Sequence, residues 1–333
     1  MNTYNYSNLD YDVRIFLENI QKNSIPPCYT LCPKEARKLF SSLQLDIDNN
    51  KITKHPANVE SHFIPNDIND SLGNKIPIYI YRPSHSTTSK SLLPVVMYFH
   101  GGGWTIGDID TYDRLIRDLV NGTNVAVVFV NYSLSPEVKY PTALEEIYTA
   151  TKWISENGKI LGLNSSRLAV AGDSAGGNLA AALTLLAKER ETPSIIFQVL
   201  LCPVTDSTNF ETSSYIEYRD GYLLTREDMK WFWNNYLPND TNRREPTISP
   251  LQATNEQLNG LPPALIIVAE NDVLCDEGEA YAKKLMEAKV PTTAIRYIGT
   301  IHDFMALNVL ADSPPSKEAI NQVTTMLKKI LSD

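Results

Sequence analysis

The stretch AVAGDSAGGNLAAALTLLA (residues 169–187) places a single serine between glycines, where a short apolar run passes into a run rich in alanine and leucine. Its centre fits the pattern G-x-S-x-G, with Gly172, Ser174 and Gly176 at the defined positions. A strand before the pattern and a helix after it are the context that holds such a serine in a tight turn, with its hydroxyl above the sheet. Larger side chains at the two glycines would collide with the neighbouring strand and helix. A glycine-rich turn without chemistry is the alternative, but the context favours Ser174 as a nucleophile.

Strands and helices alternate on both sides of this turn. Alternating or continuous apolar runs predict the strands, and apolar residues three or four positions apart predict the helices between them. The predicted strands are 75–83, 93–100, 124–132, 167–172, 195–202, 263–270 and 292–298, and the predicted helices after residue 100 are 110–121, 141–157, the run after Ser174, 276–288 and 315–331. This alternation is typical of an α/β fold with a mostly parallel sheet of about eight strands, led by an antiparallel pair and covered by helices on both faces.

Two segments fall outside the alternation. In 1–56, apolar residues in helical spacing on both sides of Pro26-Pro27 predict two amphipathic helices. Segment 205–250 is polar and rich in aromatic residues, and it contains a predicted helix that starts at Thr225 and ends by Pro238. Insertions of this kind usually emerge at the end of the sheet where ligands bind. We therefore expect cap helices in 1–56, a catalytic domain in 57–333 and a lid in 205–250.

Composition and charge argue against several classes of protein. The 333 residues are 43% hydrophobic and 21% charged, and the net charge of −9 disfavours binding to nucleic acid or to anionic membranes. The N-terminus lacks the pattern of a secretory signal, and no run reaches the roughly 18 apolar residues of a membrane span. Cys28-x3-Cys32 has no second pair to complete a zinc site. We expect a soluble, cytoplasmic protein with reduced thiols and no metal.

A serine hydroxyl needs a base to become nucleophilic, and the base needs an acid that orients it. In sheets of this kind the order along the chain is nucleophile, acid, histidine. Of the five histidines only His302 follows Ser174, and it comes just after a predicted strand. The turn after strand 263–270 offers several carboxylates, of which Asp272 lies in the turn itself. We therefore predict Ser174, Asp272 and His302 as a catalytic triad, with a rate that rises on an apparent pKa of about 6 to 7.

The segment FHGGGWTIG (99–107) follows another predicted strand and supplies three consecutive glycines. Backbone amides in such a loop suit the negative charge that develops on the oxygen of a tetrahedral intermediate. We predict that the amides of Gly101, Gly102 and Ala175 form the oxyanion hole, and that Trp104 contacts the substrate. A phosphate-binding loop is the alternative, but the spacing departs from G-x-G-x-x-G and no G-K-[ST] follows.

Four segments in this order, HGGGW (100–104), GDSAGGNLA (172–180), NDVLCDEG (271–278) and HDF (302–304), resemble the hormone-sensitive-lipase-like branch of the α/β-hydrolases, the bacterial HGGG carboxylesterases. The resemblance runs from about residue 57 to 331. It implies an α/β-hydrolase fold with a helical cap and the same triad and oxyanion residues. It also implies hydrolysis of short- to medium-chain acyl esters without a cofactor. Some members of that family form pairs, so a homodimer is one expectation.

Other activities would use the same residues. A hydrolase of amides, acylated sugars or formamides needs the same atoms, and an acyltransferase differs in excluding water. A non-catalytic ligand receptor on this fold typically lacks a member of the triad, whereas all three residues are present here. The sequence therefore predicts a serine carboxylesterase and leaves its natural substrate open.

Four positions depart from the pattern of the family. Ser133 and Ser135 stand where Arg and Ala are usual, in a segment that resembles Y-R-L-A-P-E. Cys275 replaces an expected arginine, and Asp303 replaces a common glycine after the histidine. These departures leave the predicted catalytic residues unchanged. They alter which local ion pairs can form, and through them the shape of the pocket.

Overall fold

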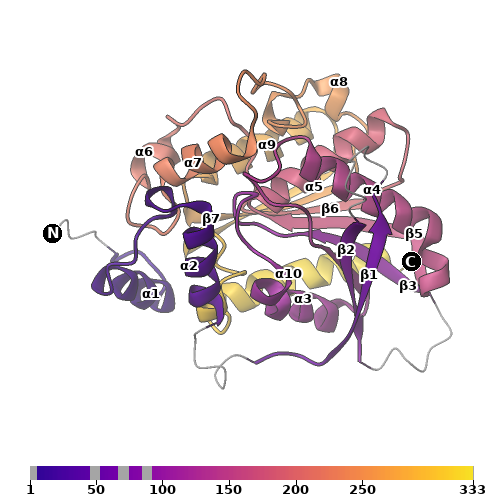
Figure 1. Ribbon diagram of the computed structural model, residues 1–333, viewed down its shortest axis with the longest axis horizontal. Coiled ribbons are helices and arrows are strands. Elements are labelled where there is room, and N and C mark those ends of the chain that lie inside the picture. The colour runs from indigo at the N-terminus through magenta and orange to yellow at the C-terminus, as the bar shows by residue number, and fades with distance from the viewer. Residues whose placement is uncertain (1–5, 46–52, 67–74, 85–91, 333) are drawn as a thin grey trace.

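The computed structural model describes residues 6–45, 53–66, 75–84 and 92–332. Within these residues one eight-stranded sheet has the order β1-β2-β4-β3-β5-β6-β7-β8 (Figure 1). β1 is antiparallel to β2 and β2 to β4, whereas all other neighbouring strands are parallel. The strands are β1 (Ala57–Pro65), β2 (Lys75–Pro83), β3 (Leu93–Phe99), β4 (Ala126–Val130), β5 (Leu163–Asp173), β6 (Phe197–Leu201), β7 (Ala264–Asn271) and β8 (Thr292–Ile301). The predicted mostly parallel sheet led by an antiparallel pair is confirmed.

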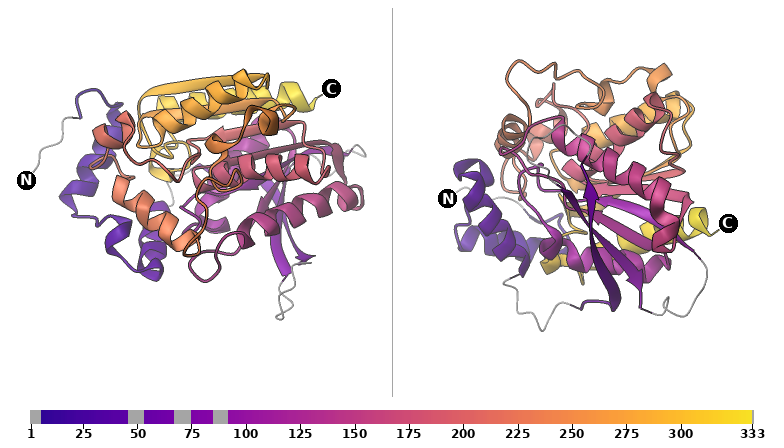
Figure 2. Two further views of the ribbon diagram at one scale, coloured as in Figure 1. Left: turned by 90° about the horizontal axis from the view of Figure 1, so that it is seen from above. Right: turned by 45° about the vertical axis from the view of Figure 1, so that its right-hand side comes forward.

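Helices cover both faces of the sheet (Figures 1 and 2). On one face lie α3 (Ile109–Thr123) and α10 (Pro314–Leu331), and on the other lie α4 (Thr142–Asn157), α5 (Ala175–Glu189) and α9 (Cys275–Glu287). Because successive strand residues point to opposite faces, each strand contributes to both apolar cores. In β3, for example, Met97 packs with the α4, α5 and α9 side and Tyr98 with the α3 and α10 side.

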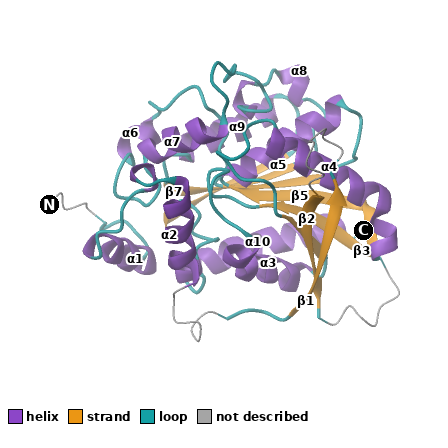
Figure 3. Ribbon diagram, viewed as in Figure 1, coloured by secondary structure: helices purple, strands orange, loops and turns teal. Residues whose placement is uncertain are grey.

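Four further helices gather at one end of the sheet (Figures 1 and 3). They are α1 (Tyr11–Lys22) and α2 (Pro33–Leu45) from the N-terminal segment, and α6 (Ser213–Glu217) and α7 (Arg226–Tyr236) from the segment that follows β6. The short elements are η1 (Cys28–Thr30), η3 (Gly158–Leu161), η4 (Pro250–Gln252), η5 (Asn308–Leu310) and α8 (Asn255–Leu258). α7 begins with a reciprocal capping box between Thr225 and Asp228 and ends before Pro238, as the sequence predicts. The predicted segment 1–56 includes residues 1–5 and 46–52, which lie outside the described residues.

The last strand is longer than the sequence predicts, and this length positions the loop that follows it. Gly299 has a φ of 73°, and the register between β7 and β8 shifts next to Ala269 before pairing resumes between Asn271 and Ile301. A glycine at such a point is typical of a β-bulge rather than of a strand end. β8 therefore continues to Ile301 and delivers the chain directly to His302.

No helix among the described residues is both long enough and apolar enough to cross a lipid bilayer.

Candidate active site

Ser174 lies between the end of β5 and the start of α5, with φ 52° and ψ −117°. Few residues with a side chain adopt this conformation, and it is held here by close packing of the backbone. A Cβ atom on Gly172 would overlap the carbonyl oxygen of Gly176, and a Cβ atom on Gly176 would overlap the carbonyl oxygen of Phe99 in β3. The glycines therefore allow α5 to approach the sheet so closely that the turn projects Ser174 above it.

The structure brings the three predicted triad residues together. His302 Nε2 lies 2.9 Å from Ser174 Oγ, and His302 Nδ1 lies 2.7 Å from Asp272 Oδ2. All three side chains are buried. They come from the carboxyl ends of β5, β7 and β8, which meet at one edge of the parallel sheet.

The hydrogen bonds define the roles of the two imidazole nitrogens. A carboxylate can only accept, so the Nδ1–H of neutral His302 donates to Asp272. Nε2 is then left with a lone pair that accepts the hydroxyl proton of Ser174. Asp272 is itself fixed because its other oxygen accepts the backbone N–H of Leu274, 3.0 Å away. This is the geometry expected of a nucleophile, a base and an orienting acid.

Burial by itself lowers the pKa of His302. The carboxylates of Asp272 and Asp303 outweigh burial because they stabilise the imidazolium, and they raise the pKa to about 9. The sequence alone predicts a value near that of an ordinary histidine. With the raised pKa, the rate should increase at a more alkaline pH than the sequence alone predicts.

The other carboxylates near the turn after β7 have separate partners. Their acceptor contacts are Glu270 with the Gly299 amide, Asp276 with the Ser214 amide, Glu277 with the Thr205 and Asp206 amides, and Glu279 with the Arg296 guanidinium. Asp272 is thus the carboxylate of this group that contacts His302.

The predicted set of oxyanion residues in the loop after β3 needs one correction. The amide of Gly101 donates to Asp173 Oδ1 at 3.1 Å, so it is not available to an oxyanion. Gly102 and Gly103 instead line the cavity beside Ser174, and no acceptor is recorded for their amides among the described residues. A sequence reading missed Gly103, and the signal that could have found it is the third glycine of the run.

Asp173 holds this loop to the serine turn. Its carboxylate accepts hydrogen bonds from the hydroxyls of Tyr98 and Tyr112, at 2.7 and 2.8 Å, in addition to the Gly101 amide. Burial raises the pKa of Asp173, and the two tyrosine hydroxyls counteract part of that rise. A carboxyl group immediately before the serine therefore fixes the distance between the loop and Ser174.

His100 also braces the loop. Its Nδ1 donates to the carbonyl of Gly101 at 2.8 Å, and its ring stacks on Tyr132 with a centroid separation of 4.3 Å. Burial lowers the pKa of His100 to about 4, so the ring stays neutral at physiological pH.

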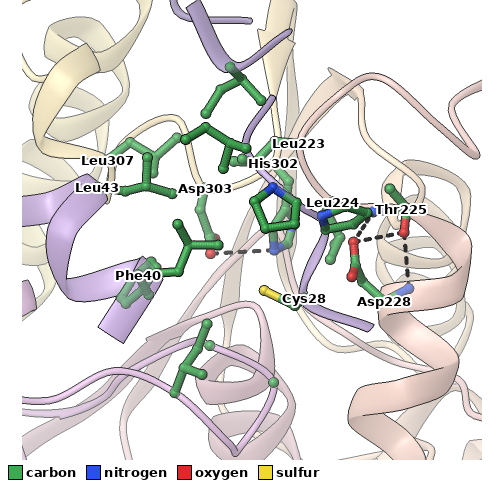
Figure 4. A pocket seen from close by; sticks show the side chains of 18 of the residues that line it. Cys28, Phe40, Leu43, Leu223, Leu224, Thr225, Asp228, His302, Asp303 and Leu307 are labelled. Carbon is green, nitrogen blue, oxygen red and sulfur yellow. Dashed lines mark hydrogen bonds and ion pairs between the residues drawn. The ribbon is translucent and has the colours of Figure 1, made fainter. Parts of the chain in front are cut away.

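A cavity of about 270 Å³ opens onto Ser174 and His302. Figure 4 shows His302 among the side chains that line it. Its walls are mostly apolar side chains from α1, α2, α7 and the segment before α7. Those side chains are Leu17, Ile20, Leu39, Phe40, Leu43, Leu223, Leu224, Met229 and Phe232. Phe232 packs directly on Gly103, where any Cβ atom would overlap its ring.

Trp104 does not line this cavity. It is fully buried and stacks on Tyr236 of α7, with ring centroids 4.3 Å apart and planes 3° apart. Its position beside the oxyanion loop therefore supports the wall from behind, without access to the substrate.

Within the part of the chain that the structure describes, one group of side chains has the spacing of metal ligands: Cys202, Asp272 and His302. Burial raises the pKa of the Cys202 thiol well above its usual value, so the thiol stays protonated and is a poor ligand. Asp272 and His302 are already bonded to each other. The contact between Asp272 and His302, together with that between His302 and Ser174, accounts for two of the three side chains.

A buried Ser-His-Asp arrangement at the carboxyl edge of such a sheet defines a serine hydrolase of the α/β type. The sequence matches a family model described as the alpha/beta hydrolase fold over residues 96–306. It is 40% identical over 265 residues to the carboxylic ester hydrolase LipN of Mycobacterium tuberculosis, covering 78% of this chain and 68% of LipN. It is 36% identical over 260 residues to an arylesterase of Saccharolobus solfataricus, covering 78% and 79% of the two chains.

A solved structure is similar over nearly the whole length. The thermostable esterase from Pseudomonas putida ECU1011 superposes with a TM-score of 0.92 at 45% identity, covering 98% of this chain and 99% of the esterase. The chain belongs to the hormone-sensitive-lipase-like carboxylesterases of the alpha/beta hydrolase family.

Proposed function

We propose that the protein is a serine carboxylesterase that hydrolyses short- to medium-chain acyl esters through Ser174, His302 and Asp272. One observation carries this proposal: His302 joins Ser174 and Asp272 by contacts of 2.9 and 2.7 Å at an apolar cavity. The esterase names of the relatives support the same class of reaction.

The first half of the reaction forms an acyl-enzyme. Ser174 Oγ attacks the ester carbonyl carbon while His302 Nε2 takes the hydroxyl proton. Asp272 stabilises the imidazolium that forms. His302 then returns the proton to the departing alcohol, and the acyl group stays on Ser174.

The amides of Gly102, Gly103 and Ala175 hold the negative oxygen in both halves of the reaction. Ala175 is the first residue of α5, so its N–H belongs to the helix terminus that favours negative charge. In the second half, water loses a proton to His302, attacks the acyl carbon and releases the acid. Ser174 recovers its proton from His302.

The cavity supports small ester substrates. At about 270 Å³ it lies just below the usual range for small-molecule sites, roughly 300–1,000 Å³. Apolar walls favour an acyl chain or an apolar alcohol group over a sugar. We propose that the N-terminal helices α1 and α2, together with segment 205–250, act as a cap on the catalytic domain, because both contribute to these walls.

The test uses p-nitrophenyl esters from acetate to decanoate with purified wild-type protein and the Ser174→Ala variant. The variant should stay folded and lose about 10⁴-fold or more in kcat/KM, because hydroxyl attack is removed. Ser166→Ala on the same strand, whose side chain is exposed, is the matched control and should keep wild-type turnover.

A Ser174→Ala protein with turnover close to that of the control would overturn the proposed nucleophile. A parallel panel of anilides, acetylated sugars and formamides separates the related hydrolases, since the proposed esterase should turn these substrates over far more slowly. Product analysis with an added alcohol separates an acyltransferase.

A further inference from the structure

Asp303 places a second carboxyl group beside the catalytic histidine. Its Oδ2 lies 3.3 Å from His302 Nε2, the same nitrogen that lies 2.9 Å from Ser174 Oγ. Figure 4 shows the Asp303 and His302 side chains facing each other at the cavity. Asp272, in contrast, contacts Nδ1 on the other side of the ring.

The carboxyl group of Asp303 is not committed elsewhere. Its Oδ1 is buried and has no hydrogen-bond partner among the described residues. Asp173, the other carboxyl group behind this site, has three partners. A carboxyl group that served only to stabilise the fold would be expected to have its hydrogen bonds satisfied. The free oxygen of Asp303 therefore points to a role at the imidazole.

The backbone at Asp303 is also unusual. Its φ of 54° lies in the left-handed region, which glycine, asparagine and aspartate tolerate best. The turn would thus accept glycine, which is common there in the family that the sequence resembles. Aspartate at this position is not required by the backbone.

Several titratable groups surround this contact. They are Asp272 after β7, Asp173 at the end of β5, Cys202 after β6, Tyr98 of β3, Tyr112 and Arg114 of α3, and Cys28 and Asp228 at the cavity wall. Arg114, the cation in this set, is bonded to Asn308, Asp118 and the carbonyls of Met305 and Ala306. Of the carboxyl groups in this set, Asp303 is therefore the one that contacts Nε2, where it competes with the Ser174 hydroxyl.

We infer that Asp303 is a positioning residue that competes with Ser174 for Nε2 of His302 and so raises the pH at which hydrolysis begins. This inference rests on the proposed function of Ser174 and His302. When the imidazole is protonated, its Nε2–H donates to the Asp303 carboxylate, and His302 cannot take the serine proton. When the imidazole is neutral, Nε2 accepts the Ser174 hydroxyl, and the nucleophile is ready.

The electrostatics give the sign of the effect. Burial lowers the pKa of His302, and Asp272 and Asp303 both raise it. An opposite charge within about 4–6 Å shifts a pKa by roughly 1–3 units. Burial also raises the pKa of Asp303 itself to about 8, against the lowering effect of the His302 imidazolium, so the carboxyl group carries its charge from about that pH upwards. In that range, removing the charge of Asp303 should lower the pKa of His302, so that the neutral and active form is present at lower pH.

Asp303→Asn tests the inference with little change in shape, because asparagine tolerates the positive φ. We expect the acidic limb of kcat/KM for p-nitrophenyl butyrate to shift by about one pH unit towards acid. Just below the wild-type midpoint, where Asp303 still carries its charge, the variant should then be up to about tenfold faster than wild type. The alkaline plateaus should differ much less.

Two further variants complete this test, one at the same position and one as a control. Asp303→Gly should give the same acidic shift if the asparagine variant folds poorly. Asp312→Asn removes the charge of an exposed aspartate paired with Lys317 and should leave the profile in place. An unchanged midpoint in both Asp303 variants overturns the inference.

A second readout does not depend on ester hydrolysis. Protein labelled with ¹⁵N-histidine reports the titration of His302 by NMR, and the signal is assigned with His302→Gln. The His302 midpoint should fall by about one unit in Asp303→Asn. If the His302 midpoint falls in Asp303→Asn but the wild-type protein hydrolyses no ester, the proposed function is rejected and the competition at Nε2 is retained. An unmoved midpoint in an active esterase would reject the competition alone.

Discussion

Ser174 combines a strained backbone with a short contact to its base. The conformation at φ 52° is maintained because two glycines let the helix, the turn and β3 pack without side chains between them. The hydroxyl is thereby fixed before any substrate binds, which lowers the cost of reaching the reactive geometry. The strain at one residue is compensated by packing around it.

Gly101 provides a prediction about the oxyanion loop. A Cβ atom at this position would overlap the Asp173 carboxylate, so Gly101→Ala should push the loop away from the serine turn. Displacing the donors of the oxyanion hole should lower kcat by about 100-fold, with a smaller change in KM. Gly158→Ala, where the added Cβ atom would lie 3.3 Å from Leu163 Cβ and overlaps no atom, is the control. Steady-state kinetics on p-nitrophenyl butyrate measure both values, and an unimpaired kcat in Gly101→Ala would contradict the role given to this loop.

At the residue scale, order along the chain was enough to predict the three side chains that the structure brings together. The serine, aspartate and histidine follow from a motif and from which strand ends they follow. Gly101 was misassigned because no pattern in the sequence reveals that its amide is bonded to Asp173, 72 positions away. Trp104 was expected at the substrate because proximity in sequence to the loop does not tell which way an indole points.

Arg37 of α2 is the main polar contact between the N-terminal helices and the oxyanion loop. Its guanidinium donates to the carbonyls of Thr105 and Ser135, at 2.8 and 2.9 Å, and forms a two-point ion pair with Glu137. Because Glu137 is largely exposed, the ion pair itself contributes little. The contact with Thr105 joins the helix to the loop, and the contact with Ser135 joins it to the segment after β4.

Arg37→Ala should therefore loosen the cavity wall without touching the catalytic atoms. We expect KM for p-nitrophenyl butyrate to rise several-fold with a smaller effect on kcat. We expect the free energy of unfolding to fall by about 1–2 kcal/mol. Lys38→Ala on the exposed side of the same helix is the control. Equal KM values for Arg37→Ala and Lys38→Ala would show that α2 does not help to shape the substrate site.

At the scale of elements, the sequence located the strands and helices better than their ends. The prediction ended the last strand before Gly299, because glycine commonly marks a turn, whereas the chain forms a bulge there and pairs again. β5 begins at Leu163, four residues before the predicted start, and its residues Leu163 and Asn164 pair with β3 ahead of a shift in register. The polar residues Asn164 to Ser166 gave no strand pattern from which this pairing could be predicted. Both ends depend on contacts between strands that are distant in sequence.

The side chain of Glu277 connects α9 to the segment after β6, and its contribution to the stability of the fold depends on pH. It lies on α9, is buried, and accepts hydrogen bonds from the amides of Thr205 and Asp206 at the start of the long segment after β6. Burial raises its pKa to about 8. Because the folded-state pKa is raised, this carboxyl group stabilises the fold fully below the pKa of the unfolded chain, and the contribution is lost as the pH rises through about 8.

Glu277→Gln should remove this dependence, since the amide keeps an acceptor and carries no charge. We expect the Tm difference between the variant and wild type to grow as the pH rises from 5 to 9, reaching roughly 3 °C, or about 2 kcal/mol, in favour of the variant. Glu287→Gln on the same helix is exposed and is the control. Differential scanning fluorimetry across this pH range measures the effect, and parallel Tm curves would contradict it.

For the whole molecule, the alternation of strands and helices was enough to predict the class of fold and the edge at which the site lies. It was not enough to predict the order of strands in the sheet, where β4 lies between β2 and β3 although it follows β3 in the chain. It also could not give the cavity, because the walls combine α1, α2 and α7, which meet only in the folded protein.

The central claim is that Ser174 is the nucleophile activated by His302. Its most direct test is labelling with a fluorophosphonate followed by mass spectrometry of the digested protein. We expect one stoichiometric adduct on the peptide that contains Ser174, and no adduct at that peptide in Ser174→Ala or, on the same time scale, in His302→Gln. An adduct on another residue, or equal labelling of wild-type and Ser174→Ala protein, would contradict the account.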